Sequence, residues 1–284
     1  MNTTKLELNK LHPFAGHPYK VQDNEEMDAL VESIRMNGIL TPLIVRPLEN
    51  GEYEIISGHR RSRAAKKVGL VTVPAIVIPF DKDSAAIAMV DSNLHREHLL
   101  PSEKAFAYRM KLEAMRHQGR RTDSTSTQVG RKSESAELIG EQSGESKNQV
   151  RRYVRLTKLI PEILQMVDEG KIALTPAVEL SYLTEAEQRD LLSVMECDEV
   201  TPSLSQAQRL HRMSLEQRLS EDEILQIMSE VKGNQVEYVK VPAEEVRRFF
   251  RPGTSMKQMA DAMLKAMDFY CRHMERVRRG SDER

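Results

Sequence analysis

Residues 53–65 constrain the fold of this chain most, because an apolar segment, a glycine turn and a basic segment follow one another there. Ile55 and Ile56 belong to a run suited to a strand, which ends at Ser57-Gly58, and the residues from Arg60 onward suit a helix. A helix that begins here places its first unpaired N–H groups beside three arginines, Arg60, Arg61 and Arg63. Such a turn favours the binding of an anion such as phosphate. A plain solvated turn with a basic first helical turn is the alternative.

The segments on either side of this turn predict a compact α+β unit over the first hundred residues. The start of the chain, which carries His12-Pro13 and His17-Pro18, predicts irregular structure. Pro74 lies inside a β-prone segment and predicts an edge strand or a bulge there. In chain order we expect a helix capped by Asp23 and ending at Asn37-Gly38, a hairpin of residues 43–45 and 53–57, a helix ending at Gly69, a strand within 71–80, and helices at 84–93 and 101–117.

A change of composition follows at residues 116–135, where Arg, Ser, Thr, Gly and Gln dominate and large apolar residues are almost absent. This predicts a flexible connector. Beyond it, a helix near residues 134–142, a Ser143-Gly144 turn and a second helix capped by Ser146 have the pattern of a helix-turn-helix.

The second helix of this pattern is basic, with five Lys or Arg residues and one acid between positions 145 and 158. A recognition helix sets its first residues against base edges, and its neighbouring cations contact phosphates. The alternative is an exposed, Arg-rich helix of an all-α protein. The candidates for base contacts are Ser146, Lys147, Asn148, Arg151 and Arg152, and those for backbone contacts are Arg155 and Lys158.

The remainder of the chain predicts further helices and a distinctive last one. A β-prone piece at residues 235–241 precedes a helix capped by Ser255. Apolar residues recur along that helix every three or four positions: Met259, Met263, Met267, Tyr270, Met274 and Val277. This stripe predicts either self-association or packing on the β-prone piece. Arg276, Arg278 and Arg279 would add non-specific DNA affinity or complement the end of the helix.

The overall composition excludes several classes of protein. Lys and Arg number 42 against 43 Asp and Glu, so any role with nucleic acid must rest on local basic patches. Cys197 and Cys271 have no His at ligand spacing, which excludes a disulfide framework and a zinc site. The chain shows neither a signal-peptide pattern nor an apolar run of membrane-spanning length, so we expect a cytoplasmic protein without a membrane partner.

Three boxes come in an order that carries a family resemblance. They are Gly38-Ile39-Leu40-Thr41-Pro42-Leu43-Ile44-Val45, then Ser57-Gly58-His59-Arg60-Arg61-Ser62-Arg63-Ala64, then Asp91-Ser92-Asn93-Leu94-His95-Arg96 and the residues up to Ala105. They resemble the N-terminal boxes of the ParB family of DNA-partition proteins, of the ParB/RepB type. The resemblance covers roughly residues 8–210. The connector and tail are similar to those of ParB-like proteins on conjugative elements of Gram-positive bacteria.

This resemblance implies a domain organisation and a set of partners. The expected parts are an α+β ParB-like N-terminal domain (1–100), an all-α domain with the helix-turn-helix (101–212), a connecting helix or linker (213–241) and a small helical C-terminal segment for dimerisation or interaction (242–284). The expected partner is double-stranded DNA, bound by a homodimer at a palindromic site in plasmid, chromosome or mobile-element partition. A ParA-type ATPase would be a further partner.

The resemblance also implies CTP with Mg²⁺ as a ligand, because many family members bind CTP and close as a clamp on DNA. By motif, Ser57, Gly58, His59, Arg60, Arg61 and Arg63 would hold the triphosphate, Thr41 and Pro42 would lie near the base, and Asn93 and Arg96 would contact metal or phosphate, Asn93 being the metal ligand. His59 stands where the family usually has Glu, Thr41 where it has Gln, and Ser92 where it has Glu. Since Mg²⁺ prefers carboxylate oxygens, these departures favour binding over hydrolysis.

Other functions stay open beside this one. A transcriptional regulator that needs no nucleotide could be built from the same parts. As an enzyme, the chain would be a weak CTP hydrolase or a metal-dependent nuclease using Asp91, His95 and His98. Sulfiredoxin-like enzymes share the N-terminal fold, but their chemistry needs a cysteine in the turn where this chain has His59.

Overall fold

A computed structural model of the protein describes residues 2–94, 96, 99–122, 128–197, 199–230 and 241–282. The chain forms two compact units, residues 1–230 and residues 231–284. Each unit is described by itself.

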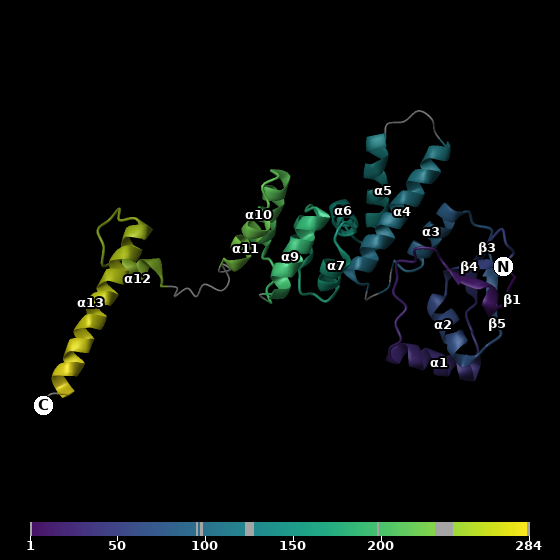
Figure 1. Ribbon diagram of the computed structural model, residues 1–284, viewed down its shortest axis with the longest axis horizontal. Helices are drawn as coiled ribbons and strands as arrows, with labels where there is room; N and C mark the ends of the chain where they lie inside the picture. The colour runs from purple at the N-terminus through teal and green to yellow at the C-terminus, as the bar shows by residue number, and fades with distance from the viewer. Residues whose placement is uncertain are drawn as a thin grey trace. The chain divides into compact units, whose positions relative to one another are not determined.

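The first unit opens with a five-stranded mixed sheet in the order β1-β5-β3-β4-β2 (Figure 1). β3 and β4 form the antiparallel hairpin that the sequence predicts. The strands are β1 (Thr4–Glu7), β2 (Leu11–Pro13), β3 (Leu43–Pro47), β4 (Tyr53–Ser57) and β5 (Thr72–Val77), with a short 3-10 helix, η1 (Leu8–Lys10), between the first two.

Two predictions about this sheet are wrong. The start of the chain is not irregular, because it supplies β1 and β2. β5 is not an edge strand either, since β1 pairs along its outer side with Lys5 opposite Pro74, without a bulge. Strands of three and four residues are too short to leave a readable alternation, so the partner that encloses β5 was not visible in the sequence.

Helices cover both faces of the sheet. Neighbouring residues of a strand point to opposite faces, and both Ile55 and Ile56 are buried. Ile55 packs in a cluster with Ala65 of α2, and Ile56 packs in one with Met89 of α3. Burial on both sides explains why two consecutive residues of β4, Ile55 and Ile56, are both apolar. The helices of this part are α1 (Glu25–Asn37), α2 (His59–Val68), α3 (Lys82–Asp91) and α4 (Pro101–Thr122).

The start of α1 differs from the prediction by one residue. Asn24 is the cap, and its side chain accepts a hydrogen bond of 3.1 Å from the Met27 N–H. Asp23 instead forms ion pairs with Arg63 and Lys67 of α2. Two cations in α2 compete with the helix end for this carboxylate, and Asn24 is free to cap.

The predicted flexible connector is helical wherever the structure describes it. α4 continues to Thr122, and α5 (Gln128–Ser143) covers residues 128–135; residues 123–127 lie outside the described part. The prediction failed because it equated a lack of apolar residues with a lack of structure. Arg, Gln and Lys propagate a helix nearly as well as Leu does.

A short turn joins α5 to α6 (Lys147–Leu156) and depends on Gly140. The Glu145 N–H donates to the Gly140 carbonyl at 2.9 Å, and a Cβ atom at position 140 would lie 2.5 Å from the Glu145 carbonyl oxygen. Ser146 caps α6, as predicted, by accepting a hydrogen bond from the Gln149 N–H. The two helices can approach this closely only with glycine at position 140.

Further helices share one core with the end of α6. Leu156, Ile163, Leu180, Leu191, Leu210 and Ile224 belong to a single buried cluster. α11 packs against α9 and α10 within this region. The helices are α7 (Pro161–Asp168), α8 (Leu174–Leu180), α9 (Glu185–Cys197), α10 (Leu204–Leu215) and α11 (Glu221–Ser229).

The second unit consists of α12 (Ala243–Arg247) and α13 (Met256–Asp282), the latter capped by Ser255 as predicted. Met259 is buried, but Leu264, Met267 and Tyr270 on one side of α13 are 70%, 59% and 56% exposed. Most of the β-prone piece at 235–241 and the side chains of Arg276, Arg278 and Arg279 lie outside what the structure describes. No helix in the described residues is long and apolar enough to cross a membrane.

Candidate functional site

A cavity of about 260 Å³ lies where β4 ends and α2 begins. It brings together residues from three separate places in the chain: the loop before α1, the turn after β4 and the segment after α3. Lining it are His17, Tyr19, Lys20, Val21, Ser57, Gly58, His59, Arg60, Arg61, Asn93 and Arg96. Seven of the residues that the sequence assigned to a nucleotide site, from Ser57 to Arg61 together with Asn93 and Arg96, therefore meet in one place.

Gly58 gives this cavity its shape. Its φ of 106° lies in the left-handed region, and a Cβ atom would lie 3.0 Å from Leu43 Cγ and 3.2 Å from Arg61 Nη2. Within the described structure no side chain caps α2, so the first N–H groups of the helix keep their hydrogen-bonding capacity. A bare helix N-terminus beside cations is suited to an anion.

Arg60 and Arg63 of α2 each form an ion pair with a carboxylate near α1. Arg60 Nη1 lies 2.9 Å from Glu26 Oε2. Arg63 binds both oxygens of Asp23, at 2.9 and 2.5 Å. Arg63 is also absent from the described lining of the cavity. Of these two predicted phosphate ligands, only Arg60 is at the cavity in this structure.

Arg61 is committed to the backbone of the loop before β3. Its guanidinium donates to the carbonyl oxygens of Thr41 and Pro42, the latter at 2.8 Å. Burial lowers the pKa of Arg61 from its usual value. The described lining residues do not include Thr41 and Pro42, which were predicted to lie near the base. Arg61 thus joins the first box of the sequence to the second.

His59 lines the cavity and contacts Phe14 and His17. The Phe14 N–H donates to His59 Nε2 at 3.4 Å, which puts the ring proton on Nδ1. The His17 ring lies 3.7 Å away between centroids. Burial, followed by the charge that His17 would carry, lowers the pKa of His59 to about 3. His59 is therefore neutral at physiological pH and can act as a hydrogen-bond donor through Nδ1.

The first residue of the third box, Asp91, forms an ion pair with a buried lysine. Asp91 pairs with Lys111, whose side chain is 3% exposed and also donates to Gln142 of α5. Asn93 uses its amide N–H groups on the Met89 carbonyl and Ser92 Oγ, at 2.9 and 3.1 Å. Its Oδ1 is the side-chain atom left for a ligand.

This donor set fits a polyphosphate better than a metal held by carboxylates. Asp91 shares its charge with Lys111, which binds its Oδ1, and Ser92 Oγ donates to the Met89 carbonyl, so both are poorer ligands for Mg²⁺ than an unpaired carboxylate. The described residues contain no cluster of three or more His, Cys, Asp or Glu suited to a metal ion. His95 and His98, which a nuclease would use, lie outside the described residues.

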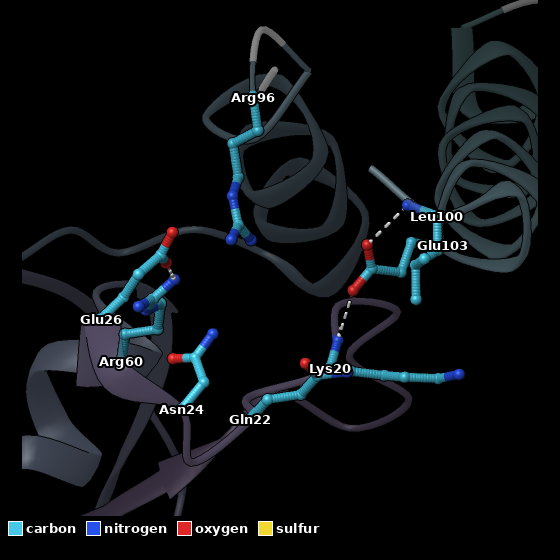
Figure 2. A pocket seen from close by; sticks show the side chains of 8 residues that line it. All are labelled: Lys20, Gln22, Asn24, Glu26, Arg60, Arg96, Leu100 and Glu103. Atoms are coloured by element: carbon cyan, nitrogen blue, oxygen red, sulfur yellow. Dashed lines mark hydrogen bonds and ion pairs between the residues drawn. The ribbon is translucent and has the colours of Figure 1, made fainter. Parts of the chain in front are cut away.

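A second cavity, of about 460 Å³, adjoins the first and shares Lys20, Arg60 and Arg96 with it. Figure 2 shows the Arg60 and Arg96 side chains entering the same space from α2 and from the segment after α3. In the part of the chain that the structure describes, Arg96 takes part in no ion pair. The remaining lining residues are Gln22, Asn24, Glu26, Leu100 and Glu103.

Lys20 and Glu103, which both line the second cavity, were not identified from the sequence. Glu103 accepts the backbone N–H groups of Lys20 and Leu100, at 2.8 and 3.0 Å. The Lys20 ammonium lies 3.0 Å from Asp168 Oδ2 of α7, and the same carboxylate accepts the N–H and hydroxyl of Ser102 at 2.9 and 2.6 Å. Lys20 belongs to the segment predicted to be irregular, where no motif marked it.

The basic face predicted on α6 divides into two sets. Arg152 donates to Thr175 Oγ1 at 2.5 Å, and Arg155 donates to Ser181 and lies 3.9 Å over the Tyr182 ring. These two arginines therefore contact α8 and the residues that directly follow it. Lys147 lies 3.4 Å from Glu137. The exposed members of the predicted set are Ser146, Asn148, Arg151 and Lys158.

Comparison with known proteins gives a match to the ParB N-terminal domain over residues 1–94. The nucleoid occlusion protein of Listeria innocua is 34% identical over 194 residues, 68% of this chain and 62% of that protein. The chromosome-partitioning protein Spo0J of Thermus thermophilus is 34% identical over 207 residues, 72% of this chain and 69% of that protein. The chain spans about three fifths of the length of the first curated relatives that it matches.

One solved structure among those that match is the C-terminally truncated chromosome-partitioning protein ParB from Caulobacter crescentus, complexed with CTP-gamma-S. Its sequence is 27% identical, and the match covers 64% of this chain and 92% of that one. The TM-score is 0.32.

Proposed function

The chain belongs to the ParB family, and we propose that it binds a specific DNA site and that a nucleotide on its N-terminal domain changes its state on that DNA. The sequences of relatives named for chromosome partitioning and nucleoid occlusion support the proposal. The process served would be the partition of a chromosome, plasmid or mobile element.

The observation that carries the DNA-binding part is the exposed basic face at the start of α6. α5 and α6 act as a helix-turn-helix, whose geometry Gly140 secures. Ser146, Asn148 and Arg151 are exposed where a recognition helix meets base edges. Lys147 and Arg152 flank them, and Arg155 and Lys158 serve the DNA backbone.

The nucleotide part rests on the cavity at the start of α2. CTP would place its phosphates against Ser57, Gly58, His59 and Arg60, with Arg96 facing them. Arg61 would hold the loop of Thr41 and Pro42 beside the base, and Arg63 would first have to leave Asp23. Mg²⁺ would arrive on the phosphates, with Asn93 Oδ1 as the side-chain oxygen offered to it. The cavity supports binding of the nucleotide.

Dimerisation belongs to the same proposal. The described part of α13 presents Leu264, Met267 and Tyr270 on one exposed face, which a second copy of the chain would cover. A two-fold dimer matches a palindromic DNA site. The division at residues 100, 212 and 241 and a ParA-type ATPase partner remain predictions from the resemblance.

The test begins with selection of bound fragments from the source genome, followed by measurement of CTP affinity with and without the selected DNA. A nucleotide-linked DNA-binding protein gives two different CTP affinities, because linkage between two ligands is reciprocal. If CTP binds in neither condition, the switch is wrong and a nucleotide-independent regulator remains. Metal-dependent cleavage of DNA that disappears in His95→Ala would instead favour the nuclease.

The Arg60→Ala variant tests the pocket itself. It should retain specific DNA binding and lose CTP binding by at least tenfold, since a charge-assisted contact contributes about 1.5 to 3 kcal/mol. Arg35→Ala is the matched control, because Arg35 forms a comparable exposed ion pair with Glu32 on α1 and does not line either cavity as described. Equal CTP affinity in the two variants would remove Arg60 from the site.

A further inference from the structure

A third hollow, of about 300 Å³, lies between α4 and α6 and is separate from the cavities at α2. Five of its lining residues are cations and one is an acid. The residues are Arg109, Leu112, Glu113, Arg116, Arg151, Val154, Arg155, Thr157 and Lys158. We refer to it as the α4–α6 cleft.

Most of the positive charge in the α4–α6 cleft has no protein partner. Arg109 pairs with Glu113 at 2.9 Å, and Arg155 is engaged with Ser181. For Arg116, Arg151 and Lys158, by contrast, the described residues provide no ion pair or side-chain hydrogen bond. Cations gathered around one hollow raise the local concentration of anions. A phosphate group is the anion that arginine forks bind best.

The two walls of the cleft are held at a fixed spacing. Tyr108 and Leu112 of α4 share a buried cluster with Ile139 of α5 and Val150 of α6. Lys104 of α4 also forms an ion pair of 2.7 Å with Glu145 in the turn before α6. The cations of α4 and α6 are therefore carried on one rigid body, which is a requirement for binding one group between them.

Two arginines of α4 line the cleft because of their spacing along the helix. Neither was named as a DNA-binding residue from the sequence. Arg109 and Arg116 are seven residues apart, so they lie on the same face of α4 about two turns from each other. That face is the one packed beside α6. Both residues fall in the helix predicted over 101–117, but the sequence does not show that this face of the helix packs beside α6.

We propose that the α4–α6 cleft binds a phosphate of the DNA backbone, so that α4 is part of the DNA-binding surface together with α6. Arg116 and Arg109 contribute from α4, and Lys158, which the proposed function already places on the DNA backbone, contributes from the end of α6. This inference rests on the proposed DNA-binding function. A free phosphate has the same chemistry as a backbone phosphate, and the test separates the two sources.

The test compares the Arg109→Ala/Arg116→Ala double variant with the full-length wild-type chain on the selected DNA fragment and on a scrambled duplex, over a series of salt concentrations. The slope of log affinity against log salt should become shallower by about 0.9 for each DNA phosphate that the variant no longer binds. This corresponds to about fivefold weaker binding per phosphate at 0.15 M salt, equal for both duplexes. CTP affinity should be unchanged.

The matched control is Arg189→Ala on α9, since Arg189 is an exposed arginine paired with a glutamate four residues away, as Arg109 is. It should bind both duplexes with the wild-type affinity and slope. The double variant is also checked for an unchanged melting temperature, because both substituted side chains lie at the surface.

Three results would overturn the inference. Wild-type affinity and slope in the double variant would show that no DNA phosphate is held there. A loss confined to the selected fragment would show that α4 reads bases instead. Saturable binding of inorganic phosphate by the wild type, abolished in the double variant while duplex binding is retained, would assign the cleft to a small anion. Absence of duplex binding by the wild type would instead sink the proposed function itself.

Discussion

The cavity at α2 and the α4–α6 cleft are both lined by arginines, but the arginines differ in their interactions with the rest of the protein. At the cavity, Arg60 is paired with Glu26 and Arg61 with two backbone carbonyls. In the cleft, Arg116 and Arg151 have no ion-pair partner within the described residues. The cavity arginines therefore contribute to the fold as well as to any ligand, whereas Arg116 and Arg151 of the cleft interact with solvent until a ligand arrives. Substitutions in the two regions should accordingly separate stability from binding.

The largest effect is expected at Asp91, two positions before the cavity residue Asn93, and at the buried Lys111 that it neutralises. Asp91→Ala leaves a buried ammonium with Gln142 alone and should lower the free energy of unfolding by about 3 kcal/mol. Lys111→Met should cost less, because Asp91 is 42% exposed and can be solvated by water once its partner is gone. Urea denaturation of both variants measures this. A larger loss in Lys111→Met would refute the argument from burial.

A pH dependence should come from the cavity and not from the cleft. The folded-state pKa of His59 is about 3, below the unfolded value of about 6.5, so the unfolded chain takes up the proton first as pH falls. His59 therefore contributes stability fully above pH 7, and about 2 kcal/mol of it should be lost between pH 7 and pH 5. Denaturation at several pH values measures the change.

The control for this pH effect is His59→Asn, which removes the titrating ring. The difference in stability between wild type and variant should shrink as the pH falls from 7 to 5, because only the wild type carries the penalty. Parallel pH profiles for the two proteins would show that other groups, such as His17, cause the loss.

The smallest effect compares one arginine from each region directly. Arg61→Ala strips the Thr41 and Pro42 carbonyls of their donor and should lower the free energy of unfolding by about 1 kcal/mol. Arg116→Ala, at the surface of the cleft, should stay within about 0.5 kcal/mol of the wild type. Thermal melts of the pair suffice. A cost at Arg116 equal to that at Arg61 would mean that the cleft is part of the fold as well.

The sequence predicted what depends on neighbouring residues and missed what depends on distant ones. The hairpin, the Gly58 turn and the start of α6 at Ser146 follow from local signals, and the structure has them where expected. β1 was missed because its pairing with β5 joins segments about seventy residues apart.

The candidate sites show the same division. The third box of the sequence marked Asn93 and Arg96, and both line the cavity with Gly58. No pattern in the sequence predicts the ion pairs of Arg63 with Asp23 and of Lys20 with Asp168. These pairs form only when α1, α2 and α7 are packed in place. The α4–α6 cleft likewise exists only once the two helices pack.

Asp168 of α7 has one more consequence, which concerns the contact between α7 and the start of α4 when an anion binds in the cavity. Its carboxylate is fastened three times, twice by Ser102 and once by Lys20. The two hydrogen bonds from Ser102 do not depend on Lys20, so they hold α7 against the start of α4 when the Lys20 ion pair breaks. The Lys20 side chain is 52% exposed, whereas Asp168 is 7% exposed and keeps both hydrogen bonds from Ser102. Lys20 can therefore turn to a new anion in the cavity while α4 and α7 stay joined through Ser102.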